Sequence, residues 1–146
     1  MSVNLIKLCV GIDDVEQLEM AQQARLDAAR AAGVTPELRH VTRNTPKRAP
    51  ELLAGRGSLY WVIRRVIRVR QRISEFRPVE REDGKPACAL ILHPELIRTR
   101  PRSFRPFQGW RYLAATDSPP DLPKGFDPSD ALPEMMADEL RELGLL

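Results

Sequence analysis

Hydrophobic and polar positions near the N-terminus predict a strand followed by a helix. Residues 3–12 (VNLIKLCVGI) are rich in aliphatic and β-branched side chains, as buried strands are. Good helix formers then fill residues 15–32 of a helix expected over 13–32. Asp13 and Glu16 have the spacing of a capping box, and Gly33 supplies a stop signal. We therefore expect a buried strand that leads directly into a helix.

Two shorter elements follow in the pattern. Residues 38–43 (LRHVTR) have strand character. A short helix is expected to begin at Thr45-Pro46 and to end at Gly55, because proline is favoured in a first turn and glycine at a helix end. Pro50 would remove a backbone hydrogen bond from that helix, so a helix that begins at Pro50 after a turn is the alternative.

Residues 59–73 (LYWVIRRVIRVRQRI) fit both the hydrophobic periodicity of a helix and that of a strand. A helix here would be basic and amphipathic, which suits a membrane surface. Strands would instead place on one face Leu59, Trp61, Ile63, Ile67, Val69 and Ile73. They would place on the other face Arg64, Arg68, Arg70 and Arg72. Because valine and isoleucine are abundant and alanine is absent, we predict strands with a break near Arg64-Arg65.

The remainder of the chain predicts a hairpin, a linker and a tail. A turn at Asp83-Gly84 separates the preceding extended run from another short apolar strand, CALILHP. Residues 114–128 are rich in proline and are expected to form an extended linker. Residues 129–146 predict an acidic helical tail. Its apolar stripe consists of Leu132, Met136, Leu140 and Leu143.

These elements predict one α+β domain over residues 1–113, with a mostly antiparallel sheet, flanking helices and a C-terminal helix beyond the linker. A chain of 146 residues, 42% of them hydrophobic, can bury its own core. No apolar run approaches the roughly 20 residues that cross a bilayer, and the N-terminus lacks signal-peptide features. We expect a cytoplasmic protein without an integral membrane segment, and the sequence leaves its oligomeric state open.

The charged residues are distributed unevenly along the chain, although the net charge is only +3. Residues 1–38 hold three basic and six acidic side chains, and residues 113–146 hold two and eight. Residues 39–112 hold eighteen basic and six acidic side chains, a local net charge of +12. Such asymmetry is typical of proteins that bind nucleic acids or anionic surfaces, and it also allows the acidic tail to dock on the basic centre.

The sequence contains no motif that indicates catalysis or metal binding. Cys9 and Cys88 lie in apolar runs where a thiol is inert, so we expect both in the core and neither as a nucleophile beside His40 or His93. These four residues also lack the short paired spacings of a zinc site. Residues 55–58 (GRGS) are interpreted as a helix end and turn. We expect no catalytic residue, metal or cofactor.

Basic and aromatic residues alternate in residues 102–113 (RSFRPFQGWRYL), which hold four of the chain's eight Phe, Trp and Tyr side chains. Arginine grips phosphate in a bidentate fashion, and aromatic rings stack on unpaired bases for about 1–3 kcal/mol each. We expect Trp110 to be the main stacking ring, with burial in the core as the alternative. The predicted binding residues are Arg64, Arg68, Arg70, Arg72, Arg98, Arg100, Arg102, Arg105, Trp110 and Arg111.

Three functions are compatible with this pattern. The leading hypothesis is non-catalytic binding of RNA or another polyanion through the arginines and Trp110. The second is a protein-interaction module whose basic face meets an acidic partner. The third, a small enzyme that acts on a nucleotide or another phosphorylated ligand, would require a concave pocket.

Three blocks of the chain carry a resemblance to a known family: LIKLCVGI, HVTRNTPKRAPELLAGRGSLYWVI with VRQRI, and ALILHPELIRTRPRSFRPFQGWRYL. Together they resemble a family of small alphaproteobacterial proteins known as a domain of unknown function. The resemblance covers roughly residues 3–113 and leaves the tail outside. More weakly, TPKRAPELLAGRGSLYWVI is similar to PUA-like domains of the ASCH kind, which implies a small barrel-like sheet that binds RNA or nucleotides.

Overall fold

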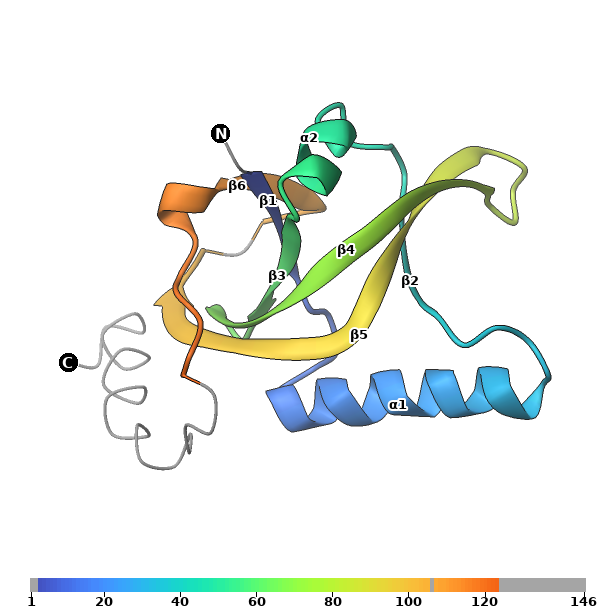
Figure 1. Cartoon of the computed structure of the whole chain (residues 1–146), viewed down its shortest axis with the longest axis horizontal. Helices are drawn as coiled ribbons and strands as arrows, with labels where there is room; N and C mark the ends of the chain where they lie inside the picture. Colours follow the sequence, from blue (N-terminus) through green and yellow to red (C-terminus); the bar gives the residue numbers. More distant parts are fainter. Residues whose placement is uncertain (1–2, 106, 124–146) are drawn as a thin grey trace.

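The structure, a computed structural model, describes residues 3–105 and 107–123, and it confirms the α+β class (Figure 1). The helices are α1 (Val15–Ala31) and α2 (Ala49–Ala54). The strands are β1 (Val3–Leu8), β2 (Leu38–Thr42), β3 (Ser58–Ile63), β4 (Val66–Glu80), β5 (Pro86–Ser103) and β6 (Trp110–Ala114). A 3-10 turn, Ala115–Asp117, follows β6.

Both helices begin slightly later than the sequence signals suggest. The cap of α1 is Asp14, whose carboxylate accepts a hydrogen bond from the Gln17 backbone N–H at 2.7 Å. The Gln17 amide oxygen in turn accepts one from the N–H of Asp13, the residue before the cap, so the capping pair Asp14 and Gln17 lies one residue beyond the predicted pair. α2 follows the alternative prediction, because Pro50 occupies its first turn, where no backbone donor is needed.

Six strands form one open, mixed sheet in the order β2-β5-β4-β3-β1-β6. β1 and β3 are parallel, and the other neighbouring pairs are antiparallel. The edges β2 and β6 do not pair with each other, so the barrel implied by the PUA-like resemblance is not confirmed. β4 and β5 form the predicted hairpin, and β5 bends sharply along its length, so that its second half passes near the start of α1 (Figure 1).

β3 and β4 confirm the prediction of strands broken at Arg64-Arg65. Both of these turn residues have a positive φ, 51° and 68°, which is unfavourable for a residue with a side chain. Trp61 pairs with Val69 whereas Val62 pairs with Ile67, so β4 carries a β-bulge at Arg68. The bulge reverses the alternation of side chains. Ile67 therefore lies on the opposite face from Val69, which differs from the predicted single apolar face.

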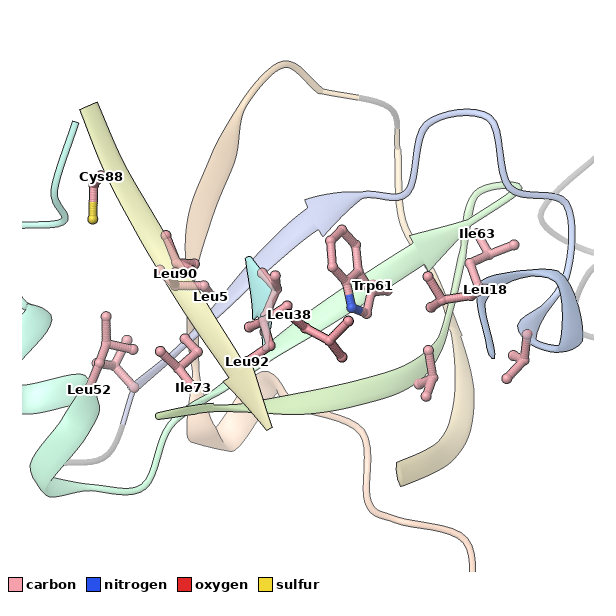
Figure 2. Packing of buried hydrophobic residues seen from close by; sticks show 14 of the residues in the cluster. Leu5, Leu18, Leu38, Leu52, Trp61, Ile63, Ile73, Cys88, Leu90 and Leu92 are labelled. Carbon is pink, nitrogen blue, oxygen red and sulfur yellow. The ribbon is translucent and has the colours of Figure 1, made fainter. Parts of the chain in front are cut away.

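The two faces of the sheet bury different clusters. The larger cluster lies between the sheet and both helices and includes Leu18 of α1, Leu52 of α2 and Trp61 of β3 (Figure 2). The smaller cluster, on the opposite face, joins Ile6, Tyr60, Val62 and Ile67 to Phe107 and Leu113. The side of the sheet that carries the larger cluster is called the α1 side below.

The chain after β6 runs back along β5 as far as the structure describes it. Asp121 forms an isolated bridge with Thr99, and the Leu122 N–H donates to the Arg98 carbonyl at 2.9 Å. Asn4 and Ser118 are joined by a hydrogen bond of 2.9 Å. The predicted tail helix and its apolar stripe lie outside the described residues.

Candidate functional site

The predicted arginines are divided between the two faces of the sheet. Arg98 lies on the α1 side, where its guanidinium pairs with Glu16 at 2.9 Å and Glu19 at 3.8 Å. Arg64 and Arg68 belong to the same neighbourhood: burial lowers the pKa of Arg68, and the charges of Arg64 and Arg98 lower it further. On the α1 side, Arg98 and Arg68 therefore interact with carboxylates at the start of α1.

A second group of arginines occupies the opposite face. Register places Arg70 beside Tyr60, Arg102 beside Ile67 and Arg111 beside Ile6, all members of the smaller cluster. The Arg70 guanidinium pairs with Asp121 at 2.7 Å, and Arg102 donates to the Asp117 carbonyl. The side chain of Arg72 alternates with that of Gln71 and also lies on this face. The bulge at Arg68 explains the division, because it reverses which face the following residues present.

The remaining predicted residues are spread along the edges. Arg100 and Arg105 are exposed. Trp110 is half-buried and packs against the larger cluster, with its ring 5.0 Å from that of Tyr112 in an edge-to-face arrangement. Arg111 lies over the Phe107 ring, 4.9 Å from its centroid. Trp110 thus contacts the core and remains partly exposed.

A cavity on the α1 side was not predicted. It has a volume of about 240 Å³ and lies between α1 and the ends of β1, β2 and β3. Its apolar wall includes Leu18, Ala21, Leu38, Trp61 and Leu92. Its polar lining residues are Lys7, Cys9, Gln22, Arg25, Arg39 and His40. Among the described residues, no carboxylate lines it.

Regular structure brings these side chains together. Leu18, Ala21 and Arg25 are spaced at three and four residues on α1, so they share one helix face. Lys7 follows Val3 and Leu5 at every second position of β1, which places it on the α1 side. Register also aligns Lys7 with Trp61 on one neighbouring strand and Trp110 on the other. Lys7 therefore lies between two tryptophans in the sheet, of which Trp61 lines the cavity.

A buried hydrogen-bond network fixes one wall of the cavity. Gln22 and Gln71 exchange two amide hydrogen bonds, of 2.9 and 2.8 Å. The Trp61 indole N–H donates to the Gln71 side-chain oxygen at 3.2 Å, and the Gln71 amide also donates to the His93 carbonyl at 2.8 Å. Gln71 is fully buried, so this network joins α1 to β3, β4 and β5 inside the core.

Cys9 and His40 both line the cavity, and both are uncharged at neutral pH. Burial raises the pKa of the Cys9 thiol to about 11, although the positive charges of Lys7 and Arg25 lower it. Burial, together with Lys7 and Arg25, lowers the pKa of His40 to about 4. The His40 ring meets the Trp61 ring edge to face at 5.3 Å, and its Nε2 has no hydrogen-bond partner among the described residues. Cys9 is only half-buried, which corrects the prediction of a core thiol.

Two larger hollows are less suitable as binding sites. One, of about 550 Å³, follows β2 and the tip of the β4-β5 hairpin, and another, of about 530 Å³, lies beside the end of α1. Both are more open, and their arginines are paired, Arg81 with Asp83 and Arg77 with Glu37. Within the described ranges, no cluster of His, Cys, Asp and Glu could hold a metal ion. Nor does any described helix have the length and apolar character to span a membrane.

No sequence signal pointed to this cavity. The spacing of Cys9 and His40 matches no local motif, and the strand pattern places Trp61 on an apolar face, which is typical of a core residue. The cavity depends on contacts between β1, α1, β2 and β3, which lie far apart in the sequence. Only the alternation of Lys7 with Val3 and Leu5 could have hinted that a basic side chain points toward the covered face.

Comparison with known proteins identifies the family. No curated protein and no solved structure matches the chain. A family model described as "Protein of unknown function (DUF1489)" matches residues 5–146. The match includes the acidic tail, which the resemblance read from the sequence had left outside. The chain therefore belongs to the family described as protein of unknown function, DUF1489.

Proposed function

We propose that this protein binds a small organic molecule in the cavity between α1 and the sheet. The observation that carries the proposal is the cavity itself, which combines an apolar wall at Leu38, Trp61 and Leu92 with several polar side chains. Such a combination is typical of small-molecule sites. Its volume of about 240 Å³ corresponds to about eight water molecules in the liquid, and so to a ligand on the order of ten non-hydrogen atoms.

The chemistry of the lining favours binding over covalent catalysis. A thiol with a pKa of about 11 is protonated at neutral pH, so Cys9 is a poor nucleophile. His40, with a pKa of about 4, is too weak a base to activate it. Both can still act as neutral hydrogen-bonding groups. The Gln22–Gln71 network supports a preformed wall, because its amides are already satisfied and need not rearrange.

The test is a titration of ¹⁵N-labelled protein with fragments of six to twelve non-hydrogen atoms, roughly the size the cavity holds. We expect at least one fragment to shift the signals of Cys9, His40 and the Trp61 indole N–H together. Ala21→Phe, which places a ring in the cavity from α1, should abolish these shifts, whereas Ala24→Phe on the exposed face of the same helix should preserve them. Shifts that are scattered, or that survive Ala21→Phe, would reject the cavity as the site.

A second candidate function, binding of single-stranded RNA, is supported by the net charge of +12 over residues 39–112. Its supporting contacts are Arg102 and Arg111, which lie over the Phe104 and Phe107 rings on the face opposite α1. If about four to six phosphates are engaged, log affinity for oligouridylate should fall with log salt with a slope near −3 to −4. A flat salt response would contradict this function, and Ala21→Phe should leave RNA binding unchanged.

A further inference from the structure

We infer that the ligand of this cavity is an organic anion whose acidic group lies between Lys7 and Arg25 and whose apolar body rests on Trp61. The inference rests on the proposed small-molecule site and specifies its ligand class. A single carboxylate or phosphate on a small aromatic or aliphatic body has this chemistry.

The convergence of two cations carries the inference. Lys7 comes from β1 and Arg25 from α1, and both line the cavity. Each of them acts electrostatically on both Cys9 and His40, so their charges reach the same region from two sides. Two converging cations and a wall without carboxylates favour a negatively charged ligand group.

The two cations are also available to a ligand. Among the described residues, neither Lys7 nor Arg25 has a carboxylate within ion-pair distance, whereas Arg39 pairs with Glu37 at 2.8 Å. Other basic side chains near α1 also form ion pairs with carboxylates: Arg30 pairs with Asp27, and Arg98 pairs with Glu16. The cavity is thus a place where positive charge is left uncompensated by the described part of the fold.

Burial along the cavity gives the ligand an orientation. Leu18, Leu38 and Trp61 are buried, whereas Arg25 and Val10 are exposed, Val10 at 86%. The apolar body therefore enters first and contacts Trp61, and the acidic group stays near the exposed Arg25. His40 is neutral and lines the same cavity, and an anion bound there should favour its protonated form.

The test compares four probes of similar shape by NMR titration: benzoate, phenyl phosphate, benzyl alcohol and benzylamine. We expect benzoate or phenyl phosphate to shift Cys9, His40 and the Trp61 indole N–H, and the neutral and cationic probes to bind at least tenfold more weakly. Added salt should weaken the anion selectively, because Arg25 is exposed. A saturating anion should also raise the pKa of His40 above about 4.

Charge-removing variants identify the responsible side chains. Lys7→Met and Arg25→Gln should each weaken benzoate binding about tenfold, the value of one charged hydrogen bond, and leave benzyl alcohol binding unchanged. Arg30→Gln is the matched control, since it removes the same charge from the same helix but does not line the cavity. It should change benzoate affinity by less than about twofold. Thermal unfolding of each variant verifies that the fold is retained.

The outcomes separate this inference from the proposed function. If benzyl alcohol binds as tightly as benzoate and Ala21→Phe abolishes both, the cavity binds small molecules but the anionic class is wrong. If benzoate binds but inorganic phosphate binds equally well and Ala21→Phe has no effect, the anion lies elsewhere and the inference is overturned. If no probe shifts Cys9, His40 or Trp61, the inference and the proposed site both fail.

Discussion

The buried Gln22–Gln71 pair should be a major stabilising contact between α1 and the sheet. Gln71→Leu would remove four hydrogen bonds, two with Gln22, one from the Trp61 indole and one to the His93 carbonyl. Gln22 and Trp61 would be left with unsatisfied groups in sites that are only 6% and 5% exposed. Each buried unsatisfied group costs about 1–3 kcal/mol. The added leucine surface offsets part of that cost. We expect a net loss of about 2–4 kcal/mol.

A double-mutant cycle tests the physical reason for this loss. Gln22→Leu alone should be destabilising because it leaves Gln71 unpaired, but the Gln22→Leu/Gln71→Leu double variant removes both amides together. The decrease in the free energy of unfolding should therefore be smaller in the double variant than the summed decreases of the two single variants, by at least about 1 kcal/mol. Gln23→Leu is the control, because Gln23 is exposed on the same helix and bonds only Asp27, so its effect should stay within about 0.5 kcal/mol.

Urea unfolding followed by tryptophan fluorescence and far-UV circular dichroism measures these free energies. The cycle is interpretable if the m-value is unchanged among variants. Additive losses, or a Gln71→Leu variant as stable as the parent, would refute the reasoning. Either result would mean that water already reaches the two amides and that the network contributes little.

Three further predictions concern the fold and the cavity. As pH falls below about 6.5, the unfolded chain protonates His40 before the folded protein does, so stability should decline toward pH 4 with a slope approaching about 1.4 kcal/mol per pH unit. Urea unfolding at pH 5 to 7 should give a shallower slope for His40→Gln, and equal slopes would contradict the neutral His40. Gly57→Ala should cost about 2–3 kcal/mol, because a Cβ there would lie 2.8 Å from the Val3 carbonyl oxygen and 3.1 Å from that of Leu52. A melting temperature within 2 °C or so of the parent would show that the backbone yields. The Arg64→Asn/Arg65→Gly variant should gain about 1 kcal/mol, since both positions have a positive φ in a two-residue hairpin turn. A loss of stability in thermal unfolding would mean that the arginine side chains contribute more than the strain costs.

Local signals predicted most of the elements. The β-branched runs at β1, β2 and β3, the glycine after α1 and the Asp83-Gly84 turn each act within a few residues, so the sequence is sufficient to predict them. The break at Arg64-Arg65 was predicted in the same way. The cap lies one residue beyond the predicted one because Asp13 and Asp14 are both residues that favour the cap position, and local signals do not distinguish them.

Side-chain direction in β4 could not be predicted from alternation. A single extra residue at Arg68 moves Ile67 and Val69 to opposite faces, and with them the arginines on either side. The bulge depends on how β4 pairs with β3 and β5, which is a property of the assembled sheet. Composition thus determined that residues 39–112 are basic, but strand pairing decided that their arginines lie on both faces of the sheet.

The cavity belongs entirely to the tertiary structure. The sequence determined which side chains are apolar, basic or titratable. Packing of α1 across β1, β2 and β3 then decided that Lys7, Arg25, His40 and Trp61 line one space. Their shared environment arises from contacts between segments far apart in the chain, and burial in that environment raises the pKa of Cys9 and lowers that of His40.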